Sequence, residues 1–179
     1  SSFKRQGSFF SAIFRKMFGG ENFFLGKYEH PNGGSLTFAP SIPGHVEHRQ
    51  LSNNSLNVMA GCFLACTPGV NIKAKFGGLK AFFSGEGAFL LEASGSGDLF
   101  FNSFGGIVKK EINGEFIVDT GHVVAFDSSL NYSITGMGNF KSTMLSGEGL
   151  VMKFKGAGTL YLQTRNVSSV ASWLTPRLL

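Results

Sequence analysis

The four residues Ser84-Gly85-Glu86-Gly87 return letter for letter as Ser146-Gly147-Glu148-Gly149, 62 positions later in the chain. Each copy is followed by an apolar run, a pair of glycines and a second apolar run. A weaker relative stands at Phe18-Gly19-Gly20-Glu21. A motif that recurs together with its surroundings indicates a chain built from similar units. We expect the glycines and the glutamate of each copy to form a turn shared by the units.

Two long segments align around these motifs, residues 61–101 and residues 121–162. Gly61 matches Gly121 at an offset of 60, and the match continues with insertions of one residue. Chance would rarely preserve the order of so many glycines and apolar positions. We therefore predict three internal repeats of about 60 residues. The predicted divisions are residues 1–40, 41–104 and 105–166, followed by a short helix and tail at 167–179.

The first of the three predicted units is incomplete in this sequence. Residues 18–25 resemble residues 83–90, and residues 33–38 resemble residues 95–100, so residues 1–40 match the second half of a unit. The counterpart of residues 61–72 has no match before Ser1. By analogy between the repeats, we expect roughly 40 further residues of this unit upstream.

The composition indicates a folded all-β protein. The chain has 179 residues, with 25 glycines, 20 phenylalanines and only 15% charged residues. This apolar content excludes a disordered chain, and abundant glycine without a collagen period is typical of tight turns between short strands. The net charge of +5 is modest. No apolar run reaches the ~18 residues that a membrane-spanning helix needs.

Several short segments predict strands and turns. Residues 70–75 alternate between apolar and polar side chains, as a half-buried strand does. Asn113-Gly114 is the strongest two-residue hairpin signal in the chain. Residues 168–174 predict one or two helical turns that end before Pro176. Other β-prone segments are residues 23–25, 35–38, 55–58, 62–66, 111–118 and 158–164.

Residues 8–18 predict a short amphipathic helix, because four of their apolar residues recur at helical spacing and Gly19-Gly20 follows. One interpretation lays this basic, apolar segment on a membrane or partner surface. The other packs the helix on its own sheet, and we favour it because the apolar stripe is short. The residues of the candidate face are Phe10, Ile13, Phe14, Arg15, Lys16 and Met17.

One triplet, Asp119-Thr120-Gly121, matches the active-site motif of aspartic proteases. Those enzymes need two carboxylates that share a proton. The equivalent triplet of the other unit is Met59-Ala60-Gly61, which carries no acid. We therefore interpret Asp119 as incidental, and no other arrangement of serine, cysteine and histidine predicts catalysis. The sequence indicates a protein that is not an enzyme.

Cys62 and Cys66, together with His45 and His48, have the residue types of a zinc site. On a strand, however, residues four positions apart are about 13 Å apart, which is too far for one tetrahedral ion. The same distance excludes a disulfide between the two cysteines. We expect buried free thiols and neither a metal nor a cofactor.

Each unit has one acidic residue at an equivalent position: Glu21, Glu86 and Glu148. Three carboxylates around a pseudo-threefold axis could hold a cation. Alternatively, each glutamate accepts hydrogen bonds from the amides of its own glycine turn. We favour this structural role for Glu86 and Glu148 and for the flanking Gly85, Gly87, Gly147 and Gly149.

The chain resembles the altered-inheritance-of-mitochondria protein 24 family over nearly its whole length. The matching residues are Gly-Leu-Lys-Ala-Phe-Phe-Ser-Gly-Glu-Gly (78–87), Asp-Thr-Gly-His-Val-Val-Ala-Phe (119–126), Met-Leu-Ser-Gly-Glu-Gly (144–149) and Leu-Gln-Thr-Arg (162–165). The resemblance implies a β-fold like that of the tryptophan RNA-binding attenuation protein. It implies three such units, each a short double-stranded β-helix or sandwich, in a pseudo-threefold ring or prism with short peripheral helices. It implies no catalytic residues, and mitochondrial members of the family are associated with the inner membrane.

Two functions are consistent with these observations. The first is a non-enzymatic β-scaffold that acts through protein or membrane-surface interaction, with a protein partner or further copies of itself. The alternative is a small-ligand or nucleic-acid binding module. Nucleic acid is the less expected partner, because stacking sites need exposed aromatic residues interleaved with Lys or Arg, and a ligand cannot be named. We expect a bacterial-type cytoplasmic protein, peripheral at the membrane if it contacts one, or a mitochondrial protein if eukaryotic.

Overall fold

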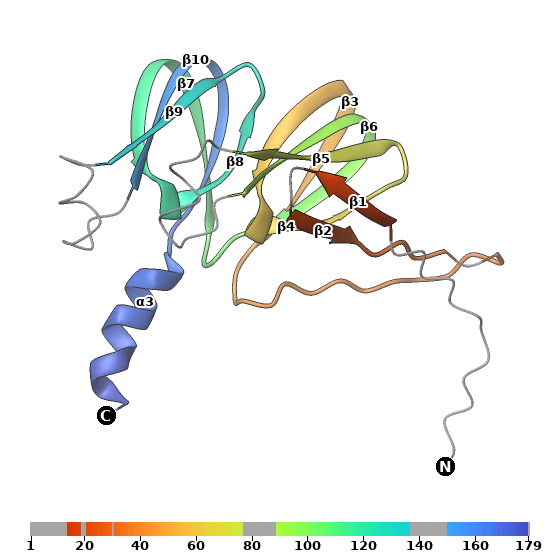
Figure 1. Cartoon of the computed structure of the whole chain (residues 1–179), viewed down its shortest axis with the longest axis horizontal. Helices are drawn as coiled ribbons and strands as arrows, with labels where there is room; N and C mark the ends of the chain where they lie inside the picture. Colours follow the sequence, from red (N-terminus) through yellow and green to blue (C-terminus); the bar gives the residue numbers. More distant parts are fainter. Residues whose placement is uncertain (1–13, 19–20, 30, 77–88, 137–149, 179) are drawn as a thin grey trace. The chain divides into compact units, whose positions relative to one another are not determined.

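The computed structural model describes residues 14–18, 21–29, 31–76, 89–136 and 150–178. The chain forms two compact units, Ser1–Phe38 and Ala39–Leu179. The described residues are predominantly β-strand, with one short α-helix (Figure 1). The predicted all-β class is therefore confirmed.

Among its described residues, the first unit contains one antiparallel pair of strands, β1 (Phe14–Phe18) and β2 (Glu21–Leu25). The helix predicted over residues 8–18 is wrong in its described part, because residues 14–18 form β1. Pairing with β2 satisfies the backbone groups of each strand that face the other, whereas an isolated helix of this length is marginal in water. Residues 35–38 were predicted to form a strand but have no regular secondary structure, and no described strand pairs with them.

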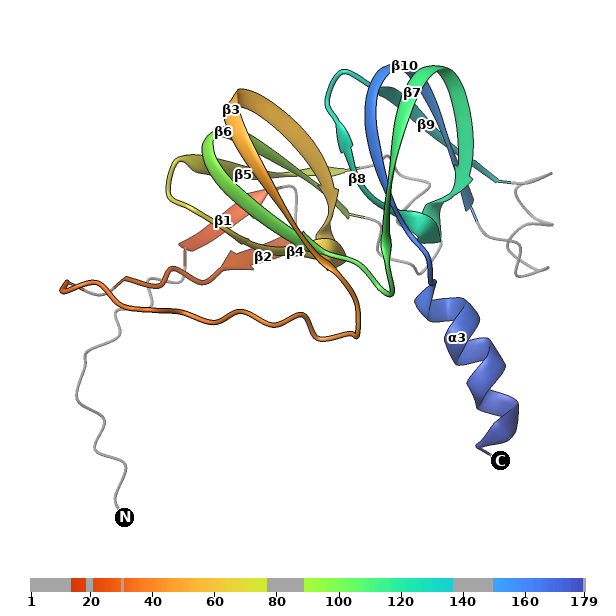
Figure 2. The same cartoon turned by 180° about the vertical axis from the view of Figure 1, so that it is seen from behind.

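The second unit contains two halves that have the same order of elements (Figure 1, Figure 2). Each element of the second half begins 60 or 61 residues after its counterpart in the first half. The first half comprises β3 (Val46–Met59), the 3₁₀ turn η1 (Ala60–Cys62), β4 (Phe63–Cys66), β5 (Val70–Phe76) and β6 (Phe89–Asn102). The second half comprises β7 (Ile107–Asp119), η2 (Thr120–His122), β8 (Val123–Asp127), β9 (Asn131–Gly136) and β10 (Leu150–Gln163).

These eight strands form one open antiparallel sheet with the order β4-β6-β3-β8-β10-β7, while β5 pairs with β6 and β9 pairs with β10. Within each half the two long strands pair along their lengths, β3 with β6 and β7 with β10. The strands β4 and β7 are the two ends of this order. The sheet is open in the described residues, so the predicted threefold ring or prism stays a prediction.

The long strands of the second half bend together at two facing glycines. Gly114 of β7 and Gly156 of β10 are directly opposite, with φ of +121° and +127°. Glycine adopts positive φ at little steric cost. The hairpin predicted at Asn113-Gly114 is therefore wrong, because β7 continues through these residues and uses the glycine to curve with its neighbour.

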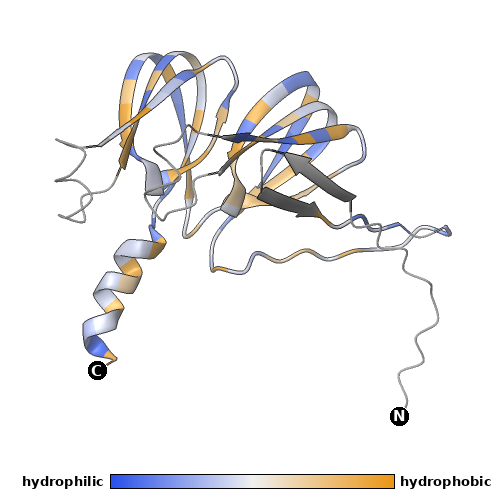
Figure 3. Ribbon diagram, viewed as in Figure 1, coloured by the Kyte–Doolittle hydropathy of each residue, from blue (hydrophilic) through white to orange (hydrophobic). Residues whose placement is uncertain are grey.

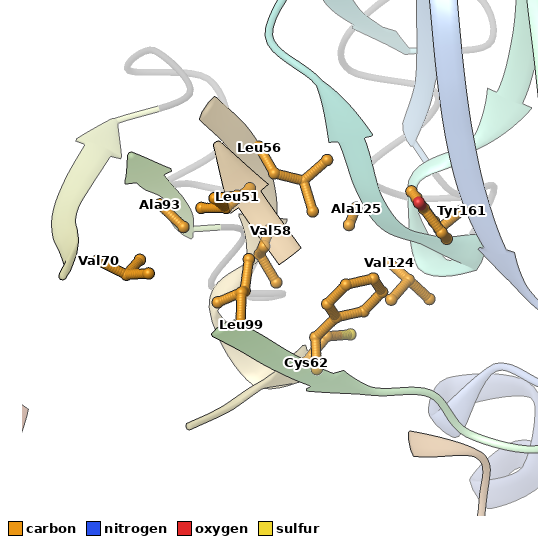
Figure 4. Close-up of a cluster of buried hydrophobic side chains, with 11 residues drawn as sticks. Leu51, Leu56, Val58, Cys62, Val70, Ala93, Leu99, Val124, Ala125 and Tyr161 are labelled. Carbon is orange, nitrogen blue, oxygen red and sulfur yellow. The ribbon is translucent and has the colours of Figure 1, made fainter. Parts of the chain in front are cut away.

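The first apolar core packs β3 against β6 and also receives residues of the second half. Leu56, Val58 and Leu99 are fully buried in it, and Ala125 of β8 and Tyr161 of β10 belong to the same cluster (Figure 4). Burial of a side chain the size of leucine or valine contributes about 1.5–3 kcal/mol. The two halves are therefore held together by a shared core.

The second apolar core lies among β8, β10 and β7. Phe126, Met152 and Phe154 are buried there with Leu160, and Leu90 of the first half joins them. The Phe126 and Phe154 rings meet edge to face, with centroids 4.9 Å apart. Hydrophilic and hydrophobic residues are interspersed along the long strands of both halves (Figure 3), whereas residues 123–126 of β8 are apolar and all buried.

A short helix, α3 (Val167–Leu174), follows the last strand. The side chain of Asn166 caps it by accepting hydrogen bonds from the backbone N–H groups of Ser168 and Ser169. The 3₁₀ turn η3 (Thr175–Arg177), with Pro176 in its first turn, continues from it. The helical turns predicted for residues 168–174 are confirmed, and no residue of α3 is buried.

Candidate functional site

The two halves of the sheet meet where β8 pairs with β3, and this pairing is called the β3–β8 joint below. It is short and antiparallel, and β8 is paired on its other edge with β10. The β3 residues in it are almost inaccessible: Leu56 and Val58 are 0% exposed and Asn57 is 3% exposed. The register places Leu56 opposite Asp127, Asn57 opposite Phe126, and Val58 opposite Ala125.

β7 holds the place in the second half that β3 holds in the first. Residues 116–118 of β7 are the counterparts of residues 56–58 at an offset of 60, and they are called the β7 edge below. They pair with β10 on one side, and no described strand pairs with their other side. Ile117 is 59% exposed there. The β7 edge is therefore an open counterpart of the buried edge of β3.

β4 is likewise the counterpart of β8, at the other end of the sheet. Within the described part of the chain it pairs only with β6. Every residue of β4 is half-buried, whereas residues 123–126 of β8 are all buried. The difference follows from pairing, because β8 has a described strand on both edges and β4 on one.

Polar contacts surround the β3–β8 joint. Arg49 of β3 donates from Nη1 to the Tyr161 hydroxyl at 3.1 Å and approaches Asp127 Oδ1 with Nη2 at 3.5 Å. The other carboxylate oxygen of Asp127 accepts the backbone N–H of Thr159 at 2.8 Å. Asp127 therefore connects β8 with β3 and with β10. In the first half, Thr67 occupies the place of Asp127, and its hydroxyl accepts the backbone N–H of Asp98 at 2.8 Å.

A further ion pair connects the beginnings of the two halves. Lys109 of β7 contacts Glu47 of β3 at 2.5 Å, and its ammonium group lies 5.6 Å from the centroid of the Tyr161 ring. The hydrogen bond to Glu47 raises the pKa of Lys109 above its usual value. This ion pair therefore supports the contact between the halves.

The charged residues beside the β7 edge are arranged differently from those around the β3–β8 joint. Lys153 contacts Glu115 at 2.8 Å, and this hydrogen bond lowers the pKa of the Glu115 carboxyl below its usual range. Lys110 is the counterpart of Arg49, and its ammonium group lies 4.9 Å from the centroid of the Phe116 ring. It makes no ion pair with any residue that the structure describes. Lys110 thus stands beside the open strand edge as a cation without an acidic partner among the described residues.

The two cysteines are free thiols. Burial raises the pKa of Cys62 from 9.0 to about 11, and burial also raises the pKa of Cys66. His48 contacts Asp98 at 2.8 Å, and His45 approaches Glu47 at 3.4 Å. The described part of the chain has no group of three or more His, Cys, Asp or Glu side chains placed to hold a metal ion.

The Asp119-Thr120-Gly121 triplet has a structural role. The Asp119 carboxylate accepts the backbone N–H of Gly121 at 2.7 Å, and the buried Thr120 hydroxyl donates to the carbonyl of Leu150 at 2.9 Å. These contacts form the turn η2, whose counterpart η1 occupies the equivalent place without an acid. The carboxylate caps a turn here.

Eight of the candidate residues in the repeated motif and on the face of the predicted helix lie outside the described part of the structure. These are Gly85, Glu86, Gly87, Gly147, Glu148 and Gly149 of the repeated motif and Phe10 and Ile13 of the predicted helix. Phe14, Arg15, Lys16 and Met17 lie in β1. The sequence predicted neither of the two open strand edges. A signal was present, because Phe116-Ile117-Val118 is apolar throughout where the equivalent Leu56-Asn57-Val58 alternates.

Asn57 is the one described side chain with a buried polar atom that lacks a partner. Its amide nitrogen donates to the Ser128 hydroxyl at 3.4 Å, and its Oδ1 has no hydrogen bond. The counterpart of this residue, Ile117, has no polar atom to satisfy. Burying the β7 edge against an apolar partner would therefore leave no side-chain polar atom of residue 117 without a hydrogen bond, unlike the burial of Asn57 in the β3–β8 joint.

Comparison with known proteins matches residues 1–165 to a family described as mitochondrial biogenesis AIM24. An uncharacterized protein of Streptococcus pyogenes serotype M6 is 33% identical over 171 residues, which cover 94% of this chain and 69% of that protein. A crystal structure of a Streptococcus pyogenes protein superposes with a TM-score of 0.70 at 32% identity. That match covers 79% of this chain and 63% of the solved chain, so this chain spans less than two thirds of it. In the described part of this chain, no helix is both long and apolar enough to cross a membrane.

Proposed function

This chain belongs to the AIM24 family, and we propose that it is a non-enzymatic β-scaffold that acts by binding other proteins at the open ends of its sheet. The observation that carries this proposal is the contrast between equivalent positions. Asn57 is buried in the β3–β8 joint, while Ile117 on the β7 edge is largely exposed. An unpaired strand edge is a template for pairing with another strand, and a large apolar residue beside it adds surface that such pairing can bury.

Strand addition is the binding mode that suits such an edge. An unpaired strand presents a row of N–H and C=O groups that an extended segment can pair with, and side chains at alternate positions give the specificity. The β3–β8 joint provides an example of this mode within the chain. The polar groups around the joint engage one another and hold the fold together, which supports a structural role for them.

We also propose that the complete body contains three units around a pseudo-threefold axis, as the repeats predict. The two halves supply two of these units. The first contains β3 and β4, and the second contains their counterparts β7 and β8. A third unit, or a partner strand in its place, would pair with the ends of the sheet at β7 and β4. The match of residues 18–25 and 33–38 to the end of a unit supports this arrangement.

The proposal is tested by placing a photo-crosslinking amino acid at position 117 in the intact protein in its source cell. The matched control carries the same amino acid at position 108, because Val108 is also exposed on β7, at 49%, but lies far from the β7 edge along the strand. We expect defined protein adducts at position 117 and few at position 108.

Native mass spectrometry of the gently purified protein distinguishes the alternatives. In the photo-crosslinking experiment, lipid adducts at position 117 would favour binding to a membrane surface over binding to a protein partner. A small mass that is released on denaturation, with no protein adduct at position 117, would contradict the scaffold and favour the small-ligand module.

A further inference from the structure

We propose that Asn32 is a site of spontaneous covalent modification, at which the side-chain amide is converted to a carboxylate through a cyclic succinimide. The chain contains two Asn-Gly pairs, Asn32-Gly33 and Asn113-Gly114. An asparagine followed by glycine suits this reaction best, because glycine has no side chain to hinder attack by its backbone nitrogen. The surroundings of the two pairs differ, and this difference selects Asn32.

The reaction needs only the chain and water. The Gly33 backbone nitrogen loses its proton and attacks the side-chain carbonyl carbon of Asn32, and the amide nitrogen leaves as ammonia. Water then opens the succinimide ring at either of its carbonyl carbons. One opening gives aspartate. The other gives isoaspartate, in which the main chain runs through the former side chain and is longer by a methylene group. No electrons are gained or lost, and the formal net charge of +5 falls by one.

The Asn32-Gly33 pair lies in an exposed turn of the first unit. Residues 31–34 are all exposed and lie outside every described strand. Gly33 has a φ of +71°, and a Cβ added to Gly33 or Gly34 would meet no atom within 4 Å. This space leaves room for the backbone rotation that brings the Gly33 nitrogen to the Asn32 side chain. Exposed segments outside a sheet also rearrange at a low cost in free energy.

The Asn113-Gly114 pair is held differently, although Asn113 is also exposed and a Cβ added to Gly114 would also meet no atom within 4 Å. Asn113 lies opposite Ala157 and Gly114 opposite Gly156, within a pairing of β7 and β10 that continues along the strand in both directions. Closing the ring there requires the Gly114 peptide to rotate out of the extended backbone, which disrupts the hydrogen-bonded ladder. Steric room is therefore similar in the two pairs, and strand pairing distinguishes them.

The experiment incubates the intact, folded chain at physiological temperature in water enriched in oxygen-18. Digestion at acidic pH then stops the reaction, and mass spectrometry follows the peptides that contain residues 32 and 113. The heavy oxygen marks carboxylates that form during the incubation. We expect Asn32 to convert many-fold faster than Asn113, with several-fold more isoaspartate than aspartate. The rate at Asn32 is expected to rise with pH, because the attacking nitrogen must lose its proton.

The same measurement on the chain unfolded in guanidinium chloride separates the effect of structure from that of local sequence. Strand pairing is lost there, so the two asparagines are expected to convert at similar rates. Two variants test the attacking nitrogen. Gly33→Ala places a methyl group beside it and is expected to slow the conversion of Asn32 several-fold, in the folded and the unfolded chain. Gly34→Ala is the matched control and is expected to leave the rate unchanged.

The outcomes separate this proposal from the proposed function. Equal conversion of Asn32 and Asn113 in the folded chain, or faster conversion of Asn113, would overturn it. Aspartate without isoaspartate at position 32 would also overturn it, because direct hydrolysis of the amide gives no isoaspartate. A difference in rate that persists unchanged in the unfolded chain would overturn the role of strand pairing. None of these results bears on the β7 edge, which photo-crosslinking at position 117 tests separately.

Discussion

Arg49 hydrogen-bonds to Tyr161 at 3.1 Å, and this contact links β3 of the first half to β10 of the second half. The Tyr161 ring is buried, and it meets the Phe101 ring edge to face with centroids 5.2 Å apart. The two halves of the sheet are thus joined by a polar contact that lies directly on their shared apolar core.

Removing this hydrogen bond is expected to destabilise the fold modestly. Tyr161→Phe keeps the ring in the core but loses the hydroxyl, and such bonds contribute about 1 kcal/mol net. Arg49 is partly exposed, so its guanidinium group can hydrogen-bond to water in the variant. Urea unfolding followed by circular dichroism measures the change. The matched control is Tyr132→Phe, because the half-buried Tyr132 ring also packs on a core aromatic residue. Equal losses in the two variants would contradict the role of the Arg49 contact.

The same truncation at two equivalent positions tests whether the β7 edge is open. Val58 is fully buried in the β3–β8 joint and Val118 is half-buried on the β7 edge. Val58→Ala removes two buried methyl groups and leaves a cavity, so we expect a loss of about 2–3 kcal/mol. Val118→Ala is expected to cost about 1 kcal/mol or less. Chemical denaturation of the purified chain measures both, and similar losses would mean that the β7 edge is covered.

The bend in β7 depends on the positive φ of Gly114. A Cβ added there meets no atom within 4 Å, so Gly114→Ala isolates the backbone cost from any clash. A non-glycine residue in the left-handed region costs about 1–2 kcal/mol. Gly61→Ala is the control, because its Cβ also meets nothing and its φ is not in that region. We expect the thermal midpoint to fall for Gly114→Ala and to stay level or rise slightly for Gly61→Ala.

Cys62 predicts a loss of stability at alkaline pH. Its pKa is raised from 9.0 to about 11 in the folded state, so the folded protein holds the proton in a range where the unfolded chain releases it. The stabilisation is complete below pH 9 and is lost as the pH rises towards 11, at about 1.4 kcal/mol per pH unit. Urea unfolding at several pH values measures this dependence. Cys62→Ala is expected to flatten it, and an unchanged slope would contradict the assignment to Cys62.

Local patterns predicted several strands of the second unit. They did not predict how far each strand extends. Alternation over residues 70–75 predicted β5, and β-prone runs predicted the ends of β3 and β10. Asn113-Gly114 was mistaken for a hairpin, because a turn signal describes only local backbone freedom. Whether that freedom serves a reversal or a bend depends on Gly156, which faces Gly114 from a strand distant in sequence.

The predicted helix over residues 8–18 failed for a related reason. Helical spacing of apolar residues is a weak signal over so short a stretch, and strand pairing with residues 21–25 outweighs it in β1. The candidate site was missed altogether. An apolar Ile117 on the outward face of a strand has meaning only when the equivalent Asn57 is seen to be buried by β8.

The sequence by itself determined the all-β class, the offset of 60 or 61 residues between equivalent segments and the membership of a family, because these depend on residue order and local periodicity. Only the tertiary structure decided that β8 pairs with β3 to make one sheet, and that β7 and β4 are left at its ends. Equivalent strands have similar local preferences, so their sequences cannot show which edge is paired. That difference comes from contacts between segments about 70 residues apart, such as Asn57 and Phe126, which form only when the chain folds.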